Sequence, residues 1–165
     1  MHVKIRDIEF SSPLLTASGT YGYGHEVQDM VDVNQWGGII TKSVTLHPRE
    51  GNPPPRIVET SSGMLNSIGL ANLGVEQYCQ EVIPVLNQLN TQVIINIAGT
   101  AIDDYVDTLK ILEKTNGNHV GYEINISCPT VVLSNIMPIG CNRVKIGGEI
   151  VLIGEKNGFQ NPIFC

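Results

Sequence analysis

The feature that most limits the fold of this chain is a repeated alternation of short apolar runs with segments of helical periodicity. We expect four of the apolar runs to be strands, and they cover residues 14–17, 38–41, 92–97 and 119–126. Helical spacing of apolar residues runs from Val75 to Leu89, with a kink expected at Pro84, and again from Ile102 to Leu112. This alternation is typical of βαβ units, so the sequence predicts an α/β fold with a parallel sheet.

Three other segments complete this prediction. Alternating apolar residues over 3–10 indicate an N-terminal strand or hairpin, and the pattern over 25–33 predicts a helix. Residues 43–73 form a long excursion rich in proline and glycine, with a short strand expected at 56–60. A loop of this length inside a compact domain is usually functional or disordered, and its scattered apolar residues favour an ordered, functional loop.

Composition narrows the functional class. The 165 residues fit one ordinary domain, and the net charge of -6 with only 5% aromatic residues disfavours a nucleic-acid surface. No apolar stretch has the length of a signal-peptide core or a membrane span, so we expect a cytoplasmic protein. The four cysteines form no C-x-x-C pair and no histidine pair has zinc spacing, so we expect neither a disulfide framework nor a metal site.

Polar residues follow the ends of the expected strands. They are Ser18, Lys42, Asn96, Asn125 and Cys128, where Asn96 lies inside its apolar run. In parallel α/β folds the carboxyl ends of the strands meet at one edge, which is where ligands bind. Each residue also has a simpler interpretation, because a single cysteine after a strand is most often an inert buried thiol and a lysine there can be an ordinary surface residue.

Five motifs in this order resemble class 1 dihydroorotate dehydrogenases, and the fourth resembles the NAD-linked type B catalytic subunit more than the fumarate-linked type A. The motifs are Ala17-Ser18-Gly19-Thr20, Thr41-Lys42-Ser43, Gly51-Asn52-Pro53-x-Pro55-Arg56, Gly63-Met64-Leu65-Asn66-Ser67-Ile68-Gly69-Leu70 and Glu123-Ile124-Asn125-Ile126-Ser127-Cys128-Pro129. The resemblance covers residues 1 to about 129. It implies a (β/α)₈ barrel that binds FMN and oxidises dihydroorotate to orotate in pyrimidine biosynthesis.

The resemblance also assigns roles to individual residues. It implies flavin-binding positions at Ser18, Lys42, Ser43, Asn96 and Asn125. It implies substrate-binding positions at Lys42, Asn66, Ser67, Ile68, Gly69, Leu70 and Asn125. Cys128 matches the active-site base, and a thiolate suits that role because its unperturbed pKa of about 8.5 lies near neutrality. Further implications are a homodimer and a partner subunit that carries FAD and a 2Fe-2S cluster and passes electrons to NAD.

The sequence departs from the family after Pro129. Thr130 stands where the family has a substrate-binding asparagine, and residues 130–165 show no second flavin lysine and no phosphate-binding glycine loop. We therefore divide the chain into residues 1–129, about the first four βα units of a barrel, and a divergent tail over 130–165. A truncated or frame-disrupted gene, or a gene-model error, would produce this pattern. We expect the chain by itself to have little or no activity.

Two alternatives remain open at this point. A related flavin barrel that acts on another pyrimidine, such as the pyrimidine-reducing domain of dihydropyrimidine dehydrogenase, would share the strand-end polar residues. A degenerate fragment that binds no flavin, or that persists only as an interaction module, would share the fold pattern without the chemistry.

Overall fold

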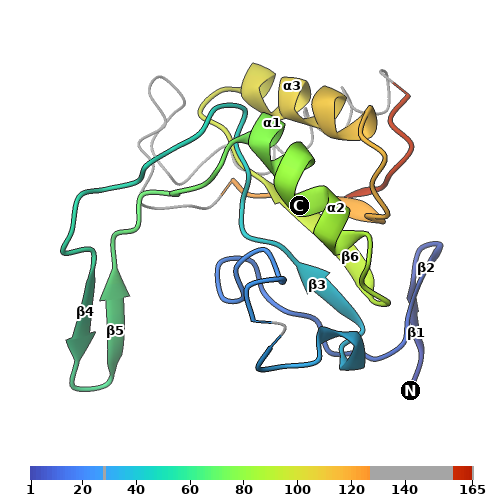
Figure 1. The fold of residues 1–165 in the computed structure, drawn as a ribbon, viewed down its shortest axis with the longest axis horizontal. Helices are drawn as coiled ribbons and strands as arrows, with labels where there is room; N and C mark the ends of the chain where they lie inside the picture. Colours follow the sequence, from blue (N-terminus) through green and yellow to red (C-terminus); the bar gives the residue numbers. More distant parts are fainter. Residues whose placement is uncertain (28, 127–157, 165) are drawn as a thin grey trace.

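The computed structural model describes residues 1–27, 29–126 and 158–164 (Figure 1). Its elements in chain order are the strands β1 (Val3–Ile5) and β2 (Ile8–Phe10), the 3-10 helix η1 (Val33–Gln35), the strands β3 (Gly38–Ile40), β4 (Ile57–Thr60) and β5 (Gly63–Asn66), the helix α1 (Val75–Gln77), the π-helical turn η2 (Tyr78–Val82), the helix α2 (Ile83–Leu86), the strand β6 (Gln92–Ile97), the helix α3 (Ile102–Glu113), and the strands β7 (Gly121–Ile124) and β8 (Ile163–Phe164). None of the helices among these residues is long and apolar enough to cross a membrane.

The central sheet has four strands in the order β3-β6-β7-β8, and every neighbouring pair is parallel. Ile40 of β3 lies opposite Ile94 of β6, and Ile97 of β6 lies opposite Ile124 of β7. Three of the four expected strands therefore form as the sequence predicts. The mixed α/β content and the parallel sheet are confirmed, and the carboxyl ends of β3, β6 and β7 meet at one edge.

The expected strand at 14–17 is wrong as a full strand. It is reduced to a single parallel bridge between Leu15 and Gly38. Pro13 precedes it and Leu14 is exposed, so only one face of a very short segment packs against the sheet. The fourth strand of the sheet is instead β8, where Ile163 lies opposite Tyr122, and the sequence analysis assigned no strand there.

The helical periodicity after residue 74 is confirmed. α1, η2 and α2 follow one another without interruption, and the kink expected at Pro84 takes the form of a π turn in which the Ile83 N–H donates to the carbonyl of Tyr78. Proline has no N–H to donate to the regular helical hydrogen bond, so a wider turn just before it sacrifices few hydrogen bonds. α3 forms over Ile102–Glu113, close to its expected bounds, and begins where Asp104 accepts hydrogen bonds from the N–H groups of Thr100 and Ala101.

The helix expected over 25–33 is wrong. The described residues of this stretch form turns, followed by η1 at Val33–Gln35. Met30 and Val31 are exposed and, of the described apolar residues of this stretch, only Val33 at its end is fully buried, so little apolar surface holds a helix here against the sheet, and tertiary packing is what stabilises most short helices. The carboxylate of Glu26 also turns back to accept hydrogen bonds from Tyr23 and Gly24, which favours a turn over a continuing helix.

The two faces of β6 bury different clusters because side chains alternate along a strand. The odd-numbered residues pack with the helices in the larger core: Val93, Ile95 and Ile97 contact the cluster that contains Tyr78, Leu86, Leu109 and Tyr122. Ile94, on the opposite face, packs with Ile8 and Phe10 of the β1–β2 hairpin. Asn96 shares the face of Ile94, so the only polar side chain in the carboxyl half of β6 points away from the helices.

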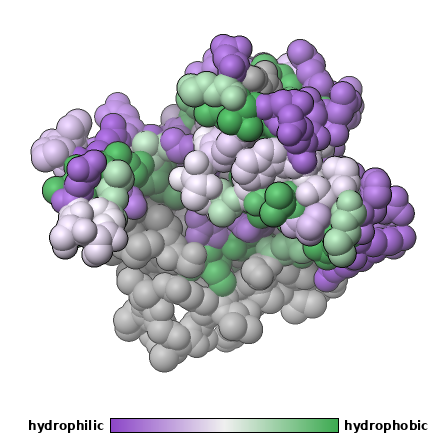
Figure 2. All heavy atoms as spheres, turned by 90° about the horizontal axis from the view of Figure 1, so that it is seen from below, coloured by the Kyte–Doolittle hydropathy of each residue, from purple (hydrophilic) through white to green (hydrophobic). Residues whose placement is uncertain are grey.

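The strands β4 and β5 form an antiparallel hairpin that projects from the body of the molecule, at the left in Figures 1 and 2. All eight strand residues are exposed, and on the face shown in Figure 2 hydrophobic residues lie among hydrophilic ones in this projecting part. The expected strand at 56–60 is thus confirmed. The base of the hairpin returns the chain to the sheet edge at Asn66.

A buried polar cluster attaches the segment before β8 to the rest of the fold. The hydroxyl of Tyr122 donates to Glu113 at 2.8 Å and lies 2.7 Å from Nε2 of His119, and the side-chain amide of Asn161 donates to Glu113 at 3.3 Å and lies 3.2 Å from the same Nε2. Glu113 also accepts a hydrogen bond from the backbone N–H of Gln160. The remaining ring nitrogen of His119, Nδ1, is buried and has no hydrogen-bond partner among the described residues.

This arrangement predicts a loss of stability on acidification. Burial lowers the pKa of His119, outweighing the attraction of Glu113, so the folded state holds the ring neutral while the unfolded state binds the proton more readily. The contribution of His119 to the free energy of unfolding is therefore fully present above the pKa of about 6.5 that histidine has in the unfolded chain, and it is lost as the pH drops below that value. The urea midpoint should decrease between pH 7.5 and pH 5.5. His119→Gln should make the urea midpoint less dependent on pH, whereas substitution of the exposed His2 by Gln should leave the dependence unchanged. An equal change of midpoint with pH in the unsubstituted chain and both variants would contradict the prediction.

Candidate functional site

A cavity of about 510 Å³ opens at the carboxyl edge of the sheet. Its lining combines small, polar and apolar residues from four separate segments: Ser18, Gly19, Gly22, Lys42, Ser43, Asn66, Ile68, Leu70 and Asn125. This volume lies within the usual range of small-molecule sites, about 300–1,000 Å³. The edge at which it lies is where parallel α/β folds bind ligands.

A β-bulge just after β3 presents Lys42 and Ser43 to the cavity. Ile40 pairs with Ile94 and Val44 pairs with Ile97, so three residues of this strand oppose two of β6. The extra residue frees the N–H of Lys42 from the ladder, and it donates to the carbonyl of Gly22 at 2.7 Å. Two consecutive side chains thereby reach the same cavity, which a regular strand would direct to opposite faces.

A chain of side-chain hydrogen bonds joins the carboxyl ends of the neighbouring strands β3, β6 and β7. Asn125 donates through Nδ2 to the hydroxyl of Ser43 at 3.0 Å. Ser43 in turn donates to Oδ1 of Asn96, and Asn96 donates through Nδ2 to the carboxylate of Glu123. Ser43 and Asn96 are both buried. The chain fixes the orientation of the polar groups that face the cavity, since each member's donor is matched to the next acceptor.

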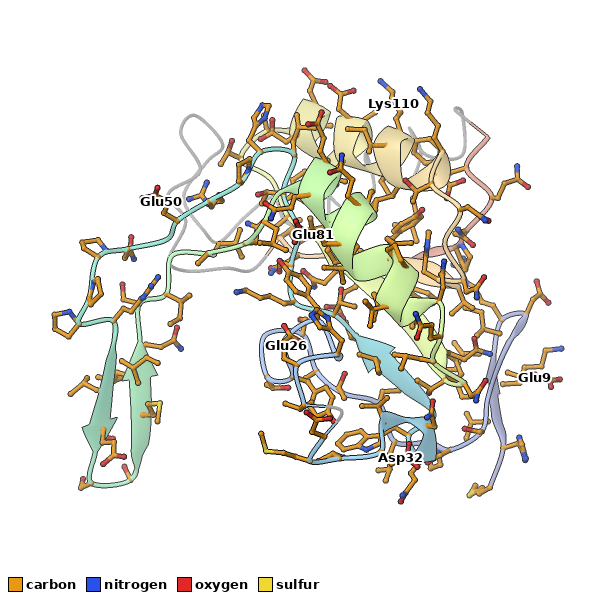
Figure 3. All side chains as sticks on the ribbon, viewed as in Figure 1. Glu9, Glu26, Asp32, Glu50, Glu81 and Lys110 are labelled. Carbon is orange, nitrogen blue, oxygen red and sulfur yellow. The ribbon has the colours of Figure 1, made fainter. Side chains whose placement is uncertain are left out.

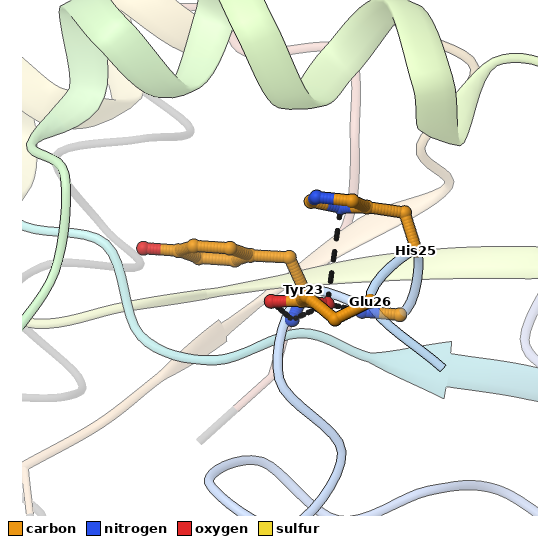
Figure 4. A network of polar contacts seen from close by, with 4 residues as sticks. Tyr23, His25 and Glu26 are labelled. Atoms are coloured by element: carbon orange, nitrogen blue, oxygen red, sulfur yellow. Dashed lines mark hydrogen bonds and ion pairs between the residues drawn. The ribbon is translucent and has the colours of Figure 1, made fainter. Parts of the chain in front are cut away.

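The turn at Gly22–Glu26 lies beside Lys42, and Figure 4 shows the polar contacts among its residues Tyr23, His25 and Glu26. The carboxylate of Glu26 accepts hydrogen bonds from the N–H groups of Tyr23 and Gly24 at 2.9–3.0 Å. A Cβ at Gly22 would lie 2.7 Å from that carboxylate, so the close turn requires glycine. The ammonium of Lys42 lies 5.9 Å from the centre of the Tyr23 ring, within cation–π range, and burial raises the pKa of the Tyr23 phenol.

The loop after β5 supplies the opposite wall. Asn66, Ile68 and Leu70 line the cavity, whereas Ser67 and Gly69 lie behind them. Asn52 holds that outer side, because its N–H donates to the carbonyl of Ile68 and its side-chain amide donates to the carbonyl and hydroxyl of Ser67.

The structure brings together most of the residues that the sequence singled out. Seven of them line the one cavity: Ser18, Lys42, Ser43, Asn66, Ile68, Leu70 and Asn125. Asn96 is not in the lining and reaches it through Ser43. Cys128, the expected base, lies outside the described residues, so its position relative to Lys42 stays a prediction.

The sequence analysis missed the residues that support the cavity from behind. Glu26 was placed in a helix, and Asn52 and Asn72 received no individual role. The available signal was the glycine and proline spacing around them, which marks turns whose backbone groups need side-chain partners. Such a signal does not say which cavity a turn will face.

Comparison with known proteins gives one consistent result. The family model described as "Dihydroorotate dehydrogenase" matches residues 1–137. The catalytic subunit of dihydroorotate dehydrogenase B (NAD(+)) from Thermodesulfovibrio yellowstonii is 49% identical over 129 residues, which is 78% of this chain and 42% of the relative. The corresponding subunit from Endomicrobium trichonymphae is 46% identical over all 165 residues, or 52% of its own length. The chain thus spans about half the length of the curated relatives it matches.

The fold and the cavity define a parallel β/α protein with a cavity of small-molecule size at the carboxyl edge of its sheet. The family match covers most of the chain and all five motifs, four of which contribute residues to the cavity lining. The chain belongs to the dihydroorotate dehydrogenase family. The alignment with the Endomicrobium relative also includes residues 130–165, and the division of the chain at residue 129 stays a prediction.

Proposed function

We propose that this chain forms about the first four βα units of a (β/α)₈ barrel that binds FMN and oxidises dihydroorotate to orotate in pyrimidine biosynthesis. One observation carries the proposal: residues from four segments far apart in the sequence, including members of four of the five motifs that resemble this family, line a single cavity. The relatives' names, which specify dihydroorotate dehydrogenase B, support the same activity.

The residues around the cavity suit a flavin and a pyrimidine. Gly19 leaves space for a flat ring close to the backbone, and Ser43 and Asn125 offer hydrogen-bond donors and acceptors at its edge. Asparagine amides pair well with the alternating N–H and C=O groups of a pyrimidine. FMN, when bound, supplies the hydride acceptor that no side chain can provide.

Lys42 supplies the positive charge of the site. No carboxylate lies within ion-pair distance of its ammonium among the described residues, so a bound anionic group would be its counter-charge. We propose that Lys42 stabilises the negative charge that develops near it during the reaction, because a fixed cation in a partly enclosed site acts most strongly where charge develops.

The reaction removes two hydrogens from adjacent carbons of dihydroorotate. We propose that the thiolate of Cys128 would take the proton from one carbon and that FMN, when bound, would supply the acceptor for the hydride from the other, so that the substrate would gain a C=C bond and lose two electrons in total. Asn66, Ser67, Ile68, Gly69 and Leu70 would hold the substrate together with Lys42 and Asn125. Ser18, Lys42, Ser43, Asn96 and Asn125 would hold the flavin.

The assembly follows from the same proposal. The name of the relatives, a catalytic subunit of an NAD(+)-linked enzyme, supports a partner subunit that passes the electrons on to NAD. We propose that this partner carries FAD and a 2Fe-2S cluster, that the catalytic subunits pair as a homodimer, and that the protein acts in the cytoplasm.

Anaerobic flavin reduction tests the proposal. FMN is added to the purified 165-residue chain, dihydroorotate is mixed in, and the absorbance of oxidised flavin is followed. We expect slow bleaching, because the described residues form a sheet that ends at β3 and β8 rather than a closed barrel. Cys128→Ala should abolish it, and dihydrouracil should not replace dihydroorotate.

Each arm has a contrary outcome. Bleaching by dihydrouracil alone would favour a barrel that acts on another pyrimidine. Absence of FMN binding by the folded chain would contradict the proposal for these residues. Bleaching that persists in Cys128→Ala would remove Cys128 from the role of base.

A further inference from the structure

One wall residue of the cavity has an unusual backbone. Leu70 has a φ of +59°, directly after Gly69 at +75°. Residues with a Cβ avoid this left-handed region because the Cβ approaches the following carbonyl, and such a conformation persists only where surrounding contacts impose it. Leu70 lines the cavity, so the contacts that impose its conformation also shape the cavity wall.

The side chain that binds the backbone of Leu70 is that of Asn72. Its Nδ2 donates to the carbonyl of Leu70 at 2.8 Å and to the hydroxyl of Thr45 at 2.9 Å. Its Oδ1 accepts from the N–H groups of Thr45 at 3.1 Å and Gly74 at 2.9 Å. The hydroxyl hydrogen of Thr45 is directed to the carbonyl of His47, at 2.6 Å, which leaves the oxygen of that hydroxyl to accept from Asn72.

Asn72 is therefore a buried residue whose side-chain amide has all of its hydrogen-bonding capacity satisfied. Its side chain makes these four hydrogen bonds, and its backbone exchanges both of its hydrogen bonds with Arg49. It connects Leu70 to the segment that follows the bulge at Lys42 and Ser43. Two walls of the cavity are thus joined behind the lining by one side chain that does not itself line the cavity.

We propose that Asn72 is a positioning residue, which holds Leu70 in its left-handed conformation and so fixes the wall at Ile68–Leu70 against the wall at Lys42. Aspartate has the same shape but no amide hydrogens, so its carboxylate would face the Leu70 carbonyl without a donor. The backbone part of this inference stands on the geometry alone, and only its effect on ligand binding rests on the proposed function.

The test compares Asn72→Asp with Asn87→Asp. Asn87 is a matched control, because its side-chain amide also joins two backbone groups. It donates to the carbonyl of Asn116 and accepts from the N–H of Asn118. Both partners lie in the connection between α3 and β7, at the sheet edge opposite the cavity. The first measurement is amide hydrogen exchange in the folded chain. The backbone N–H groups of Ser67 and Asn72 report the loop, and those of β6 report global opening.

We expect Asn72→Asp to accelerate exchange of the loop amides at least tenfold relative to those of β6, and Asn87→Asp to leave this ratio unchanged. Leu70→Gly added to Asn72→Asp should restore part of the protection, since glycine adopts positive φ freely. An unchanged ratio in Asn72→Asp would overturn the inference, as would equal acceleration of the loop and β6. If Asn72→Asp does not fold, Asn72→Ser is measured against the same criteria.

The second measurement is orotate affinity of the FMN-loaded chain by titration calorimetry. We expect at least a tenfold weakening in Asn72→Asp and no change in Asn87→Asp. If the unsubstituted chain binds neither FMN nor orotate, the proposed function fails, while the exchange ratio still decides the role of Asn72. If orotate binds equally to both variants despite the changed exchange ratio, the effect of Asn72 on binding is refuted.

Discussion

Replacing Lys42 with methionine is expected to weaken orotate binding by roughly 10- to 150-fold. A hydrogen bond to a charged group contributes about 1.5–3 kcal/mol, and each 1.4 kcal/mol is about tenfold in affinity. Methionine keeps the length and the apolar stem that passes the Tyr23 ring but removes the charge. Titration of the FMN-loaded chain with orotate measures the change directly.

Lys110 provides the matched control for this substitution. It lies on α3, where Figure 3 shows its side chain pointing away from the sheet, and it pairs only with Asp107 one turn earlier. Lys110→Met removes the same charge far from the cavity and should leave orotate affinity within twofold of the unsubstituted chain. An equal loss in both variants would show that net charge, rather than the position of Lys42, governs binding.

Replacing Ile95 with alanine is expected to destabilise the fold by about 2–5 kcal/mol, the usual cost of removing a large buried aliphatic side chain. Ile95 lies in the middle of β6, is fully buried, and packs in the core between the sheet and the helices. For a chain of this size the loss corresponds to a fall in Tm of roughly 4–20 °C. Thermal unfolding followed by circular dichroism measures it.

Ile57→Ala tests whether burial is the cause of the loss of stability expected for Ile95→Ala. Ile57 lies on the β4–β5 hairpin with 53% of its surface exposed, so the same atoms are removed where little apolar surface is hidden from water. Its effect on stability should remain within about 0.5 kcal/mol. A loss comparable to that of Ile95→Ala would mean that the hairpin packs against something in solution.

The elements that the sequence predicts well are those whose stability comes from a repeating pattern. The apolar runs that become β3, β6 and β7, and the periodic segments that become the helices, each bury a continuous face. Their order alone brings Lys42, Asn96 and Asn125 to one edge. The cavity was predictable for the same reason, since parallel strands align their carboxyl ends.

The elements that the sequence did not predict depend on single long-range contacts. The turn at Tyr23–Glu26 forms because one carboxylate caps two N–H groups, although the local pattern also fits a helix. β8 is only two residues long, and it becomes a strand because β7 offers it an edge. The left-handed Leu70 depends on Asn72, and no periodicity in the sequence records that dependence.

The chain of hydrogen bonds from Asn125 to Glu123 has a built-in direction. A carboxylate only accepts, so Asn96 must turn its amide nitrogen toward Glu123 and its oxygen toward Ser43, and Ser43 must then donate inward and accept from Asn125. The negative charge of Glu123, acting through Asn96, therefore determines whether the Ser43 hydroxyl donates or accepts a hydrogen bond at the cavity. If Glu123 were neutral, the hydrogen bonds from Asn125 to Glu123 could point in either direction. A cavity of the same shape would then offer a ligand two different arrangements of donors and acceptors.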